Sequence, residues 1–256
     1  MRGIIAIFRK ELAIAFSSSI FYTVSFIFLV VSGYFFYSNS GYFNILSLQA
    51  TRNPFLSERL NLTDMVMRPF FSDIAILLLL MLPLITMRVY AEEKKSGTIE
   101  LLFTYPISDI AVLTGKYCAT MLVLLTMLAG TIPYPVILAV FGSLEWGIVI
   151  SGYLGIILMG GSFIALGIFT SCLTENQIVA AVISFGTLLL FWVIGWAGVM
   201  AGPSWGPILK HISIISHLDP FTQGLIDTRD IVFYLLFIFF WLFLTLRFLN
   251  SRFWRD

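Results

Sequence analysis

Two motifs in this sequence contain residue types that could perform chemistry, and neither has the spacing that its chemistry requires. His211 and His217 are the only histidines. They stand six residues apart with no cysteine nearby, whereas zinc sites in proteins combine several such ligands. The segment Thr114–Tyr117, TGKY, lacks the first glycine of a phosphate-binding loop and the hydroxyl residue after its lysine. The sequence therefore predicts no metal site, no nucleotide cofactor and no catalytic residue in this chain.

The densest group of charges lies between Arg88 and Asp109, in RVYAEEKKSGTIELLFTYPISD. This stretch holds seven of the 29 charged residues, which are 15 basic and 14 acidic. Gly97 divides it, because glycine is a poor helix former, and we expect the helix that contains VYAEEKK to end there. The charges predict that this first part lies in water, beyond a membrane surface.

The second part of the stretch, TIELLFTY, predicts a short amphipathic helix. Leu101, Leu102 and Tyr105 can share one face of it. Pro106 ends it, and Ser108–Asp109 is a good N-cap for the helix that follows. The apolar face must be buried, either on the membrane surface or against a soluble partner that pushes on the protein.

The rest of the chain consists mainly of membrane-compatible residues. It is 59% apolar and 11% charged, with a mean hydropathy of +0.96, whereas soluble domains are about 25% charged. A membrane helix needs roughly 20 apolar residues to cross the hydrocarbon core. Six runs qualify: Ile20–Tyr37, Pro69–Met87, Tyr117–Phe141, Ile148–Cys172, Ile178–Met200 and Ile231–Leu249. Unbroken runs such as IAILLLLMLPLI exclude the alternating strands of a barrel. The predicted fold class is an all-α polytopic membrane protein with one domain, 1–256, and nothing in it suggests nucleic-acid binding.

The basic residues predict the orientation of these six spans. With an even number of spans both termini share a side. Ten basic residues fall on that side: Arg2, Arg9, Lys10, Arg88, Lys94, Lys95, Lys116, Arg247, Arg252 and Arg255. Five fall on the other: Arg52, Arg59, Arg68, Lys210 and Arg229. The positive-inside rule therefore places both termini and the segment 88–116 in the cytoplasm.

The residues before the first span, 1–18, have an amphipathic pattern. Apolar residues recur at helical spacing: Ile5, Phe8, Leu12 and Phe16. Arg9, Lys10 and Glu11 occupy another sector. We expect a helix that lies along the cytoplasmic surface. The alternative is an early start of one long first span.

Two spans contain helix breakers, and small residues recur in two others. The breakers are Pro83 in the second span and Gly130, Pro133 and Pro135 in the third. They predict kinks or a broken helix. The pairs Gly161/Ala165 and Gly198/Gly202 favour close helix approach.

Ionisable residues are nearly absent from the spans. Asp73 lies about one turn inside the second span, where it could be a relay or could find water or Arg68. Ion-coupled transport needs such residues in the membrane. Any uphill movement would therefore draw its energy from outside this chain.

Three stretches of the sequence carry a family resemblance. MRVYAEEKKSGTIELLFTYPIS resembles the cytoplasmic-loop signature of ABC-2 type permeases, the membrane subunits of ATP-binding-cassette transporters. FRKELAIAFSSSIFYTVSFIFLVVSGYFF resembles the start of the gliding-motility and auxiliary-component branch, and ISIISHLDPFTQGLIDTRDIVFYLLFIFFWLFLT resembles its last outer loop and sixth span. Leu218 departs from that pattern, because an aromatic residue is commoner there.

The resemblance implies a permease of the cytoplasmic membrane that exports or moves a substrate. It implies two copies of a separate ATPase subunit that bind ATP and Mg²⁺, a second permease that is identical or a sibling, and contact with membrane lipid. The segment 88–116 would be the cytoplasmic coupling loop with its coupling helix. Nine residues would contact the ATPase: Glu92, Glu93, Gly97, Thr98, Glu100, Leu101, Leu102, Thr104 and Pro106.

The resemblance also assigns two further groups of residues. Arg9, Lys10 and Glu11 of the surface helix would lie near the ATPase contact. The segment 202–230 would form short re-entrant helices that act as an outer gate, or only as a lid. Its matching residues are His217, Phe221, Gly224, Asp227 and Asp230.

Two other classes of function remain open at the level of the sequence. One is a channel or carrier that works without ATP. The other is a membrane enzyme, or a force-transmitting or anchoring component of a larger machine. The substrate cannot be read from the residues.

Overall fold

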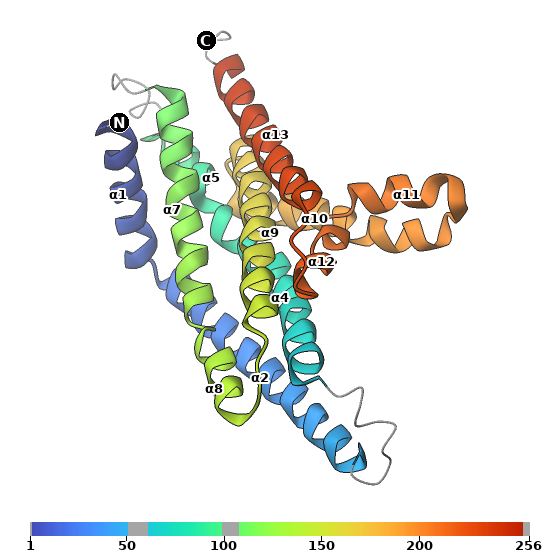
Figure 1. Ribbon diagram of the computed structural model, residues 1–256. Helices are drawn as coiled ribbons and strands as arrows, with labels where there is room; N and C mark the ends of the chain where they lie inside the picture. Colours follow the sequence, from blue (N-terminus) through green and yellow to red (C-terminus); the bar gives the residue numbers. More distant parts are fainter. Residues whose placement is uncertain (1, 51–60, 99–107, 253–256) are drawn as a thin grey trace.

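The computed structural model (Figure 1) describes residues 2–50, 61–98 and 108–252, and every regular element in these ranges is helical. The helices in chain order are α1 Arg2–Ser17, α2 Ser19–Ala50, the π-helical turn η1 Thr63–Met67, α4 Arg68–Thr86, α5 Arg88–Lys95, α7 Asp109–Ala129, α8 Pro133–Phe141, α9 Trp146–Leu173, α10 Gln177–Met200, α11 Gly202–Ile212, the short 3₁₀ turn η2 Ile215–His217, α12 Asp219–Thr222 and α13 Thr228–Arg252.

Six segments are long and apolar enough to cross a membrane. They are Ser19–Ala50, Thr63–Lys95, Asp109–Phe141, Trp146–Leu173, Gln177–Met200 and Thr228–Ser251. Each contains one of the six predicted runs, so the predicted fold class is confirmed. The start of α1, the helix α5 and the end of α13 lie at one end of the bundle, which we call the α5 end (Figure 1). The short helix α12 and the end of α2 lie at the opposite end, the α12 end.

The central helix of the bundle is α9. Within its most apolar window 78% of the residues are buried, against 17% for α2 and 11% for the last segment. Glycines allow its neighbours to approach: a Cβ at Gly160 would lie 2.5 Å from Leu124 Cδ2 of α7, and one at Gly167 would overlap Thr86 of α4. The predicted small pair also lies here, with Gly161 beside Tyr117 and Ala165 fully buried. Thus α9 is the framework against which α4, α7, α10 and α13 pack.

The first membrane helix is much longer than the predicted run. We expected Ile20–Tyr37, and α2 continues to Ala50. The polar residues after Tyr37 contain no proline, and Gly41 faces open space. Because nothing there breaks the backbone hydrogen bonds, the helix continues where apolar composition alone suggested an end.

The second and third spans are interrupted in different ways. Pro83 lies inside α4, and Met87 separates α4 from α5, so the second span consists of two helices. The third span breaks at residues 130–132 into α7 and α8, as Gly130 and Pro133 predict. Ser108 has the extended backbone of an N-cap, but its side chain makes no capping hydrogen bond, unlike what we expected.

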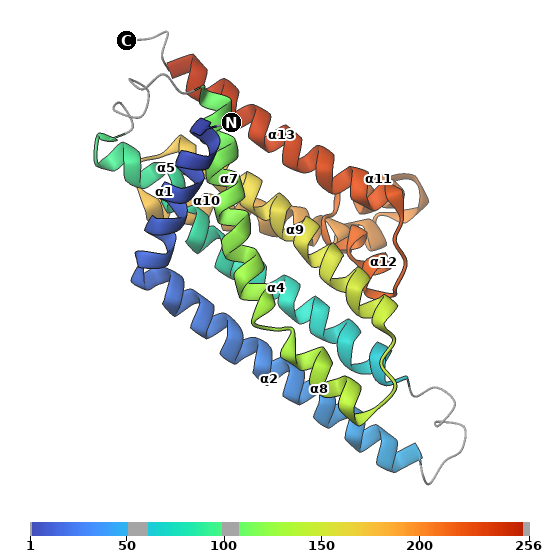
Figure 2. The ribbon, with the colours of Figure 1, turned by 60° about the vertical axis from the view of Figure 1, so that its left-hand side comes forward.

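The helix α1 is separate from α2, so the alternative of one long first span is wrong. Figure 2 shows α1 turning away from α2 and lying beside α7. Ile7 is buried there, and a Cβ at Gly115 of α7 would lie 2.9 Å from Ile7 Cβ. The helix α1 therefore packs against the third span through Ile7, whereas Ile5, on the predicted apolar face, is 51% exposed.

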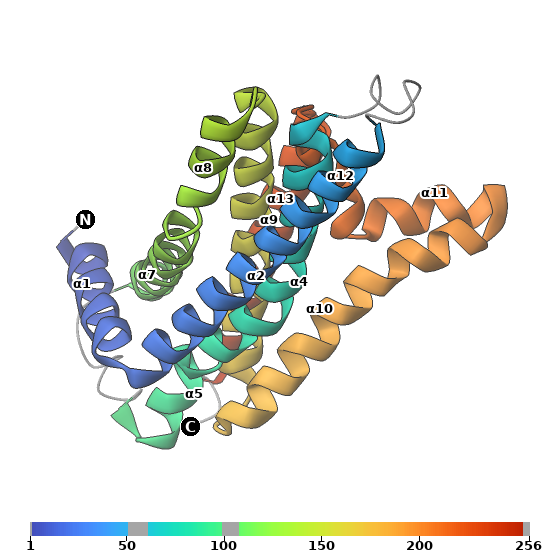
Figure 3. The same cartoon turned by 90° about the horizontal axis from the view of Figure 1, so that it is seen from below.

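The helices α10 and α11 form a hairpin that projects beyond the other helices (Figure 3). Gly202 forms its turn with a φ of +74°. A Cβ at Gly206 would lie 2.7 Å from the main-chain oxygen of Gly198. The predicted pair Gly198/Gly202 therefore does not pack as a pair: Gly198 faces Gly206, and Gly202 serves the turn.

Candidate functional site

The first half of the candidate site is the joint between α4 and α5. Because the helix is interrupted at Met87, the first N–H groups of α5 need acceptors from outside the helix. Ser171 of α9 supplies one: its Oγ accepts from Tyr90 N and Ala91 N, each at 3.0 Å, and donates to Met87 O at 2.8 Å. One buried hydroxyl thus fixes the start of α5 to the central helix. At the other end of α5, Lys94 Nζ donates to Cys172 O of α9.

The second half of the site is a cluster of four charged side chains, which we call the charged junction: Lys10, Glu11, Glu93 and Lys116. At its centre, Lys116 Nζ lies 2.8 Å from Glu11 Oε1 and 2.9 Å from Glu93 Oε2. Lys116 Nζ also donates to Val89 O at 2.9 Å. Its side chain is only 1% exposed. Burying an ammonium is costly unless it is paired and hydrogen-bonded, and here three acceptors satisfy it.

The charged junction also includes a more exposed lysine, which lies on α1. Lys10 Nζ donates to Glu93 Oε1 at 2.8 Å, and its side chain is 45% exposed. Burial lowers the pKa of Lys10, but the hydrogen bond and charge of Glu93 and the charge of Glu11 outweigh it, so the pKa is raised. Lys10 therefore stays positive at neutral pH. The junction as a whole joins α1, α5 and α7 at the α5 end.

The structure brings together only some of the residues expected at an ATPase contact. Lys10, Glu11 and Glu93 meet in the charged junction, whereas Arg9 and Glu92 are exposed. Gly97 has a φ of +70°, so the helix ends before it as predicted, and Thr98 is exposed. Glu100, Leu101, Leu102, Thr104 and Pro106 lie outside the described residues.

Sequence reasoning missed Lys116 and Ser171. A signal for Lys116 exists, because it shares a helix face with Val112, Ala119 and Val123, all buried. A lysine on such a face needs a buried acid. No comparable signal marks Ser171, because serine is an ordinary residue inside membrane helices. Together the two residues connect α5 to α7, α1 and α9.

A second candidate site lies at the α12 end and is centred on His217. Its Nδ1 lies 2.6 Å from Asp230 Oδ1, and its Nε2 lies 3.0 Å from His211 O. The ring stacks on Phe233 with centroids 3.8 Å apart. We call these residues, with Tyr234, the histidine cluster. Tyr234 is fully buried and its hydroxyl donates to Ile214 O at 2.9 Å.

The other predicted gate residues surround this cluster. Phe221 is fully buried, and its main-chain oxygen accepts from Ser151 Oγ of α9 at 2.8 Å. Gly224 has a φ of +85° in the turn after α12. Asp227 Oδ1 accepts from Arg229 N at 2.9 Å and so starts α13. The segment 202–230 thus contains the expected short helices, and its role as a gate stays a prediction.

The charged and histidine residues in the described ranges form no cluster suited to a metal ion. Both ring nitrogens of His217 are already engaged, so this histidine cannot donate a lone pair to zinc without losing a partner. Asp73, the carboxylate inside the second span, accepts from Asn39 Nδ2 of α2 at 3.0 Å. Its partner is therefore an amide rather than the Arg68 that we considered.

Comparison with known proteins gives one family. A family model described as ABC-2 family transporter protein matches residues 5–255, which is nearly the whole chain. The curated proteins contain no match to this chain. The family match does not separate the branches of the family, so the gliding-motility branch stays a prediction.

Proposed function

The chain belongs to the ABC-2 family of transporter proteins, and on this premise we propose that it is a permease subunit driven by two copies of a separate ATPase. As a component of an ABC transporter it is a multi-pass membrane protein. We further propose that its α5 end faces the cytoplasm and that it exports or moves a substrate across the cytoplasmic membrane.

The observation that carries this proposal is the fixation of α5. A segment that transmits force must be joined firmly to what it moves. Here α5 is hydrogen-bonded to α9 through Ser171, and Glu93 of α5 is ion-paired to Lys10 of α1 and Lys116 of α7. The segment 99–107, which carries the apolar face predicted to meet the ATPase, begins four residues after the end of α5.

The mechanism that we propose begins with closure of the ATPase dimer around bound ATP. The closure pushes the coupling loop, and α5 passes the displacement to α9 and α7. Packed bundles respond to such a displacement by changing between two discrete packings. In one packing a path between two permeases is open to the cytoplasm, and in the other it is open to the outside.

The α12 end would control the outer opening of that path. The segment 202–230 is tied to the central helix by Ser151 and packs on it at Gly155. A change in the packing of α9 would therefore move α12. We propose that this segment gates the path, next to a second permease that is identical or a sibling.

The direct test reverses the charge and polarity of the proposed ATPase contact. The variant Glu100→Arg with Leu101→Arg is expressed with a candidate ATPase subunit that co-purifies with the unaltered chain, and co-purification and ATPase stimulation are measured. We expect both to fall at least tenfold. A matched control is Asp64→Arg, an exposed acid at the α12 end, which should leave both unchanged.

Two results would contradict the proposal. The first is an unchanged complex and unchanged ATPase stimulation in the double variant. The second is substrate flux by the purified chain alone in liposomes without nucleotide, which would indicate a channel or carrier.

A further inference from the structure

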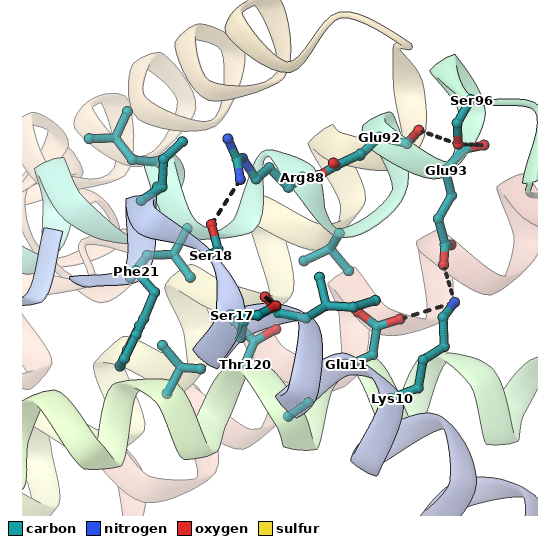
Figure 4. Close-up of a pocket in the computed structure, with 18 of the residues that line it drawn as sticks. Lys10, Glu11, Ser17, Ser18, Phe21, Arg88, Glu92, Glu93, Ser96 and Thr120 are labelled. Atoms are coloured by element: carbon teal, nitrogen blue, oxygen red, sulfur yellow. Dashed lines mark hydrogen bonds and ion pairs between the residues drawn. The ribbon is translucent and has the colours of Figure 1, made fainter. Parts of the chain in front are cut away.

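A cavity of about 600 Å³ lies at the α5 end, between α1, α2, α4, α5 and α7 (Figure 4). This volume is within the range of roughly 300–1,000 Å³ that is usual for small-molecule sites. Its lining includes Lys10, Glu11 and Glu92, which the family resemblance places at or near the ATPase contact, so the cavity lies beside the proposed coupling site. It shares one wall with the charged junction, whose residues Lys10 and Glu11 are part of its lining.

The lining has two parts of opposite character. The apolar part is formed by Ile20, Phe21, Ile85, Ala119 and Val123. The polar part is formed by Ser17, Ser18, Arg88, Glu92, Ser96 and Thr98. At the edge of the cavity, Ile14 and Leu84 are 48% and 39% exposed. A cavity with an apolar wall, exposed apolar edges and a polar wall fits a molecule that is itself amphipathic.

Arg88 provides the cavity with an unused cationic group. Its Nη1 donates to Ser18 Oγ at 3.0 Å, while its Nε is buried and has no hydrogen-bond partner. None of the ion pairs among the described residues includes Arg88. The planar guanidinium matches the oxygens of a phosphate, which can accept two parallel hydrogen bonds from it.

Apart from Arg88, the described residues of the lining include only one charged side chain that is not ion-paired, and it is a carboxylate. Lys10, Glu11 and Glu93 are neutralised within the charged junction. Glu92 lies one helical turn after Arg88 and takes part in no ion pair among the described residues. The cavity therefore presents one available cation and one available anion, both on α5.

We propose that this cavity binds a phospholipid whose headgroup carries both a phosphate and a primary ammonium group, as phosphatidylethanolamine does. The phosphate accepts hydrogen bonds from Arg88, and the ammonium group donates to Glu92. An acyl chain covers Phe21 and Ile85 and leaves the cavity past Leu84 into the membrane. The lipid then bridges α1 and α5 beside the charged junction.

The choice of lipid follows from the pairing of charges. A headgroup with phosphate alone, such as phosphatidylglycerol, would leave Glu92 unpaired next to a negative charge. A phosphatidylcholine headgroup has the same net charge as phosphatidylethanolamine, but its methylated nitrogen has no N–H to donate. The structure thus predicts an order of affinity with phosphatidylethanolamine first.

The test uses the purified full-length chain in detergent and requires no ATPase. Native mass spectrometry measures the affinity for phosphatidylethanolamine, phosphatidylcholine and phosphatidylglycerol. We expect at least tenfold tighter binding of phosphatidylethanolamine. Arg88→Gln should abolish this advantage and weaken phosphatidylethanolamine at least tenfold, while Glu92→Gln should bring it level with phosphatidylcholine. The control Lys95→Gln changes an exposed residue of the same helix outside the cavity and should change nothing.

A second variant keeps the test decisive if Arg88→Gln does not fold. Ile85→Trp fills the apolar part of the cavity without removing a charge, and it should also displace the lipid. The proposal is overturned if Arg88→Gln or Ile85→Trp retains full affinity for phosphatidylethanolamine, or if either of the other lipids binds the unaltered chain as tightly. Because lipid affinity is measured on the chain alone, these outcomes are independent of whether the ATPase proposal is correct.

Discussion

The charged junction at the α5 end and the histidine cluster at the α12 end hold their surroundings together in different ways. In the junction, Lys116 and Glu11 are 105 residues apart and Lys10 and Glu93 are 83 apart. In the cluster, His217 and Asp230 are 13 apart and Tyr234 and Ile214 are 20 apart. The junction therefore connects distant segments of the chain, while the cluster folds one loop onto the helix that follows it.

The two regions also differ in what stabilises them. The junction depends on a nearly fully buried ammonium group between two carboxylates. At the α12 end packing contributes more: besides its 2.6 Å contact with Asp230, His217 is stacked on Phe233, and the neighbouring Phe221 fills the space left by Gly155. Charge is therefore the sensitive quantity at the α5 end, and volume is the sensitive quantity at the α12 end.

The largest effect is expected from Lys116→Met. The substitution keeps an unbranched side chain but leaves Glu11 and Glu93 without their buried partner. Breaking a buried ion pair costs about 3–5 kcal/mol. We expect a loss of this size in the free energy of unfolding, measured by chemical denaturation in detergent. Lys95→Met, which removes an exposed lysine from α5, is the matched control and should have almost no effect.

A triple variant in which both acids are also neutralised tests the same explanation. Glu11→Gln and Glu93→Gln, added to Lys116→Met, should restore much of the lost stability, because uncharged groups are cheaper to bury. If the single variant is as stable as the unaltered chain, the junction is not the electrostatic centre that we describe.

The next effect in size is expected from Gly155→Ala, which adds volume at the α12 end. Its Cβ would lie 2.7 Å from Phe221 Cβ and 2.9 Å from Leu218 Cδ1. Overpacking of this kind costs about 1–3 kcal/mol. The control is Gly186→Ala in α10, where no atom lies within 4 Å of the new methyl group. Equal stability of the two variants would show that α12 is free to move away from α9.

The smallest effect is expected from Asp230→Asn. The amide keeps the shape of the carboxylate and can still hydrogen-bond to His217, so only the added strength of a charged acceptor is lost. We expect a loss of about 1 kcal/mol in the free energy of unfolding. A loss as large as that of Lys116→Met would mean that the α12 end also depends on a buried charge.

The number and type of the membrane helices could be predicted because each span needs a long apolar run. The length of α2 could not, because residues 38–50 are polar enough to suggest an end and yet contain nothing that stops a helix. The break after α7 was predictable because Gly130 and Pro133 lie close together, and the end of α5 was predictable because Gly97 follows a run of charged residues. Single glycines such as Gly41 do not interrupt α2.

The partners of the buried charges were not predictable. Lys116 was assigned to the cytoplasmic side from the count of basic residues, and its contact with Glu11 depends on α1 packing on α7. That packing is decided by Gly115 and Ile7, two residues without a distinctive pattern. The resemblance placed Lys10 and Glu11 near the coupling loop, but no rule of spacing could show that they meet Glu93.

The length of α2 has a consequence for the membrane around it. Its 32 residues extend about 48 Å, while the hydrocarbon core is about 30 Å thick. Even a tilt of about 40°, which is at the upper limit for membrane helices, leaves more than one turn outside the core. The exposed rings of Tyr37 and Tyr42 are suited to the interface between lipid and water. A thicker bilayer would therefore cover more of α2 without any change in this helix.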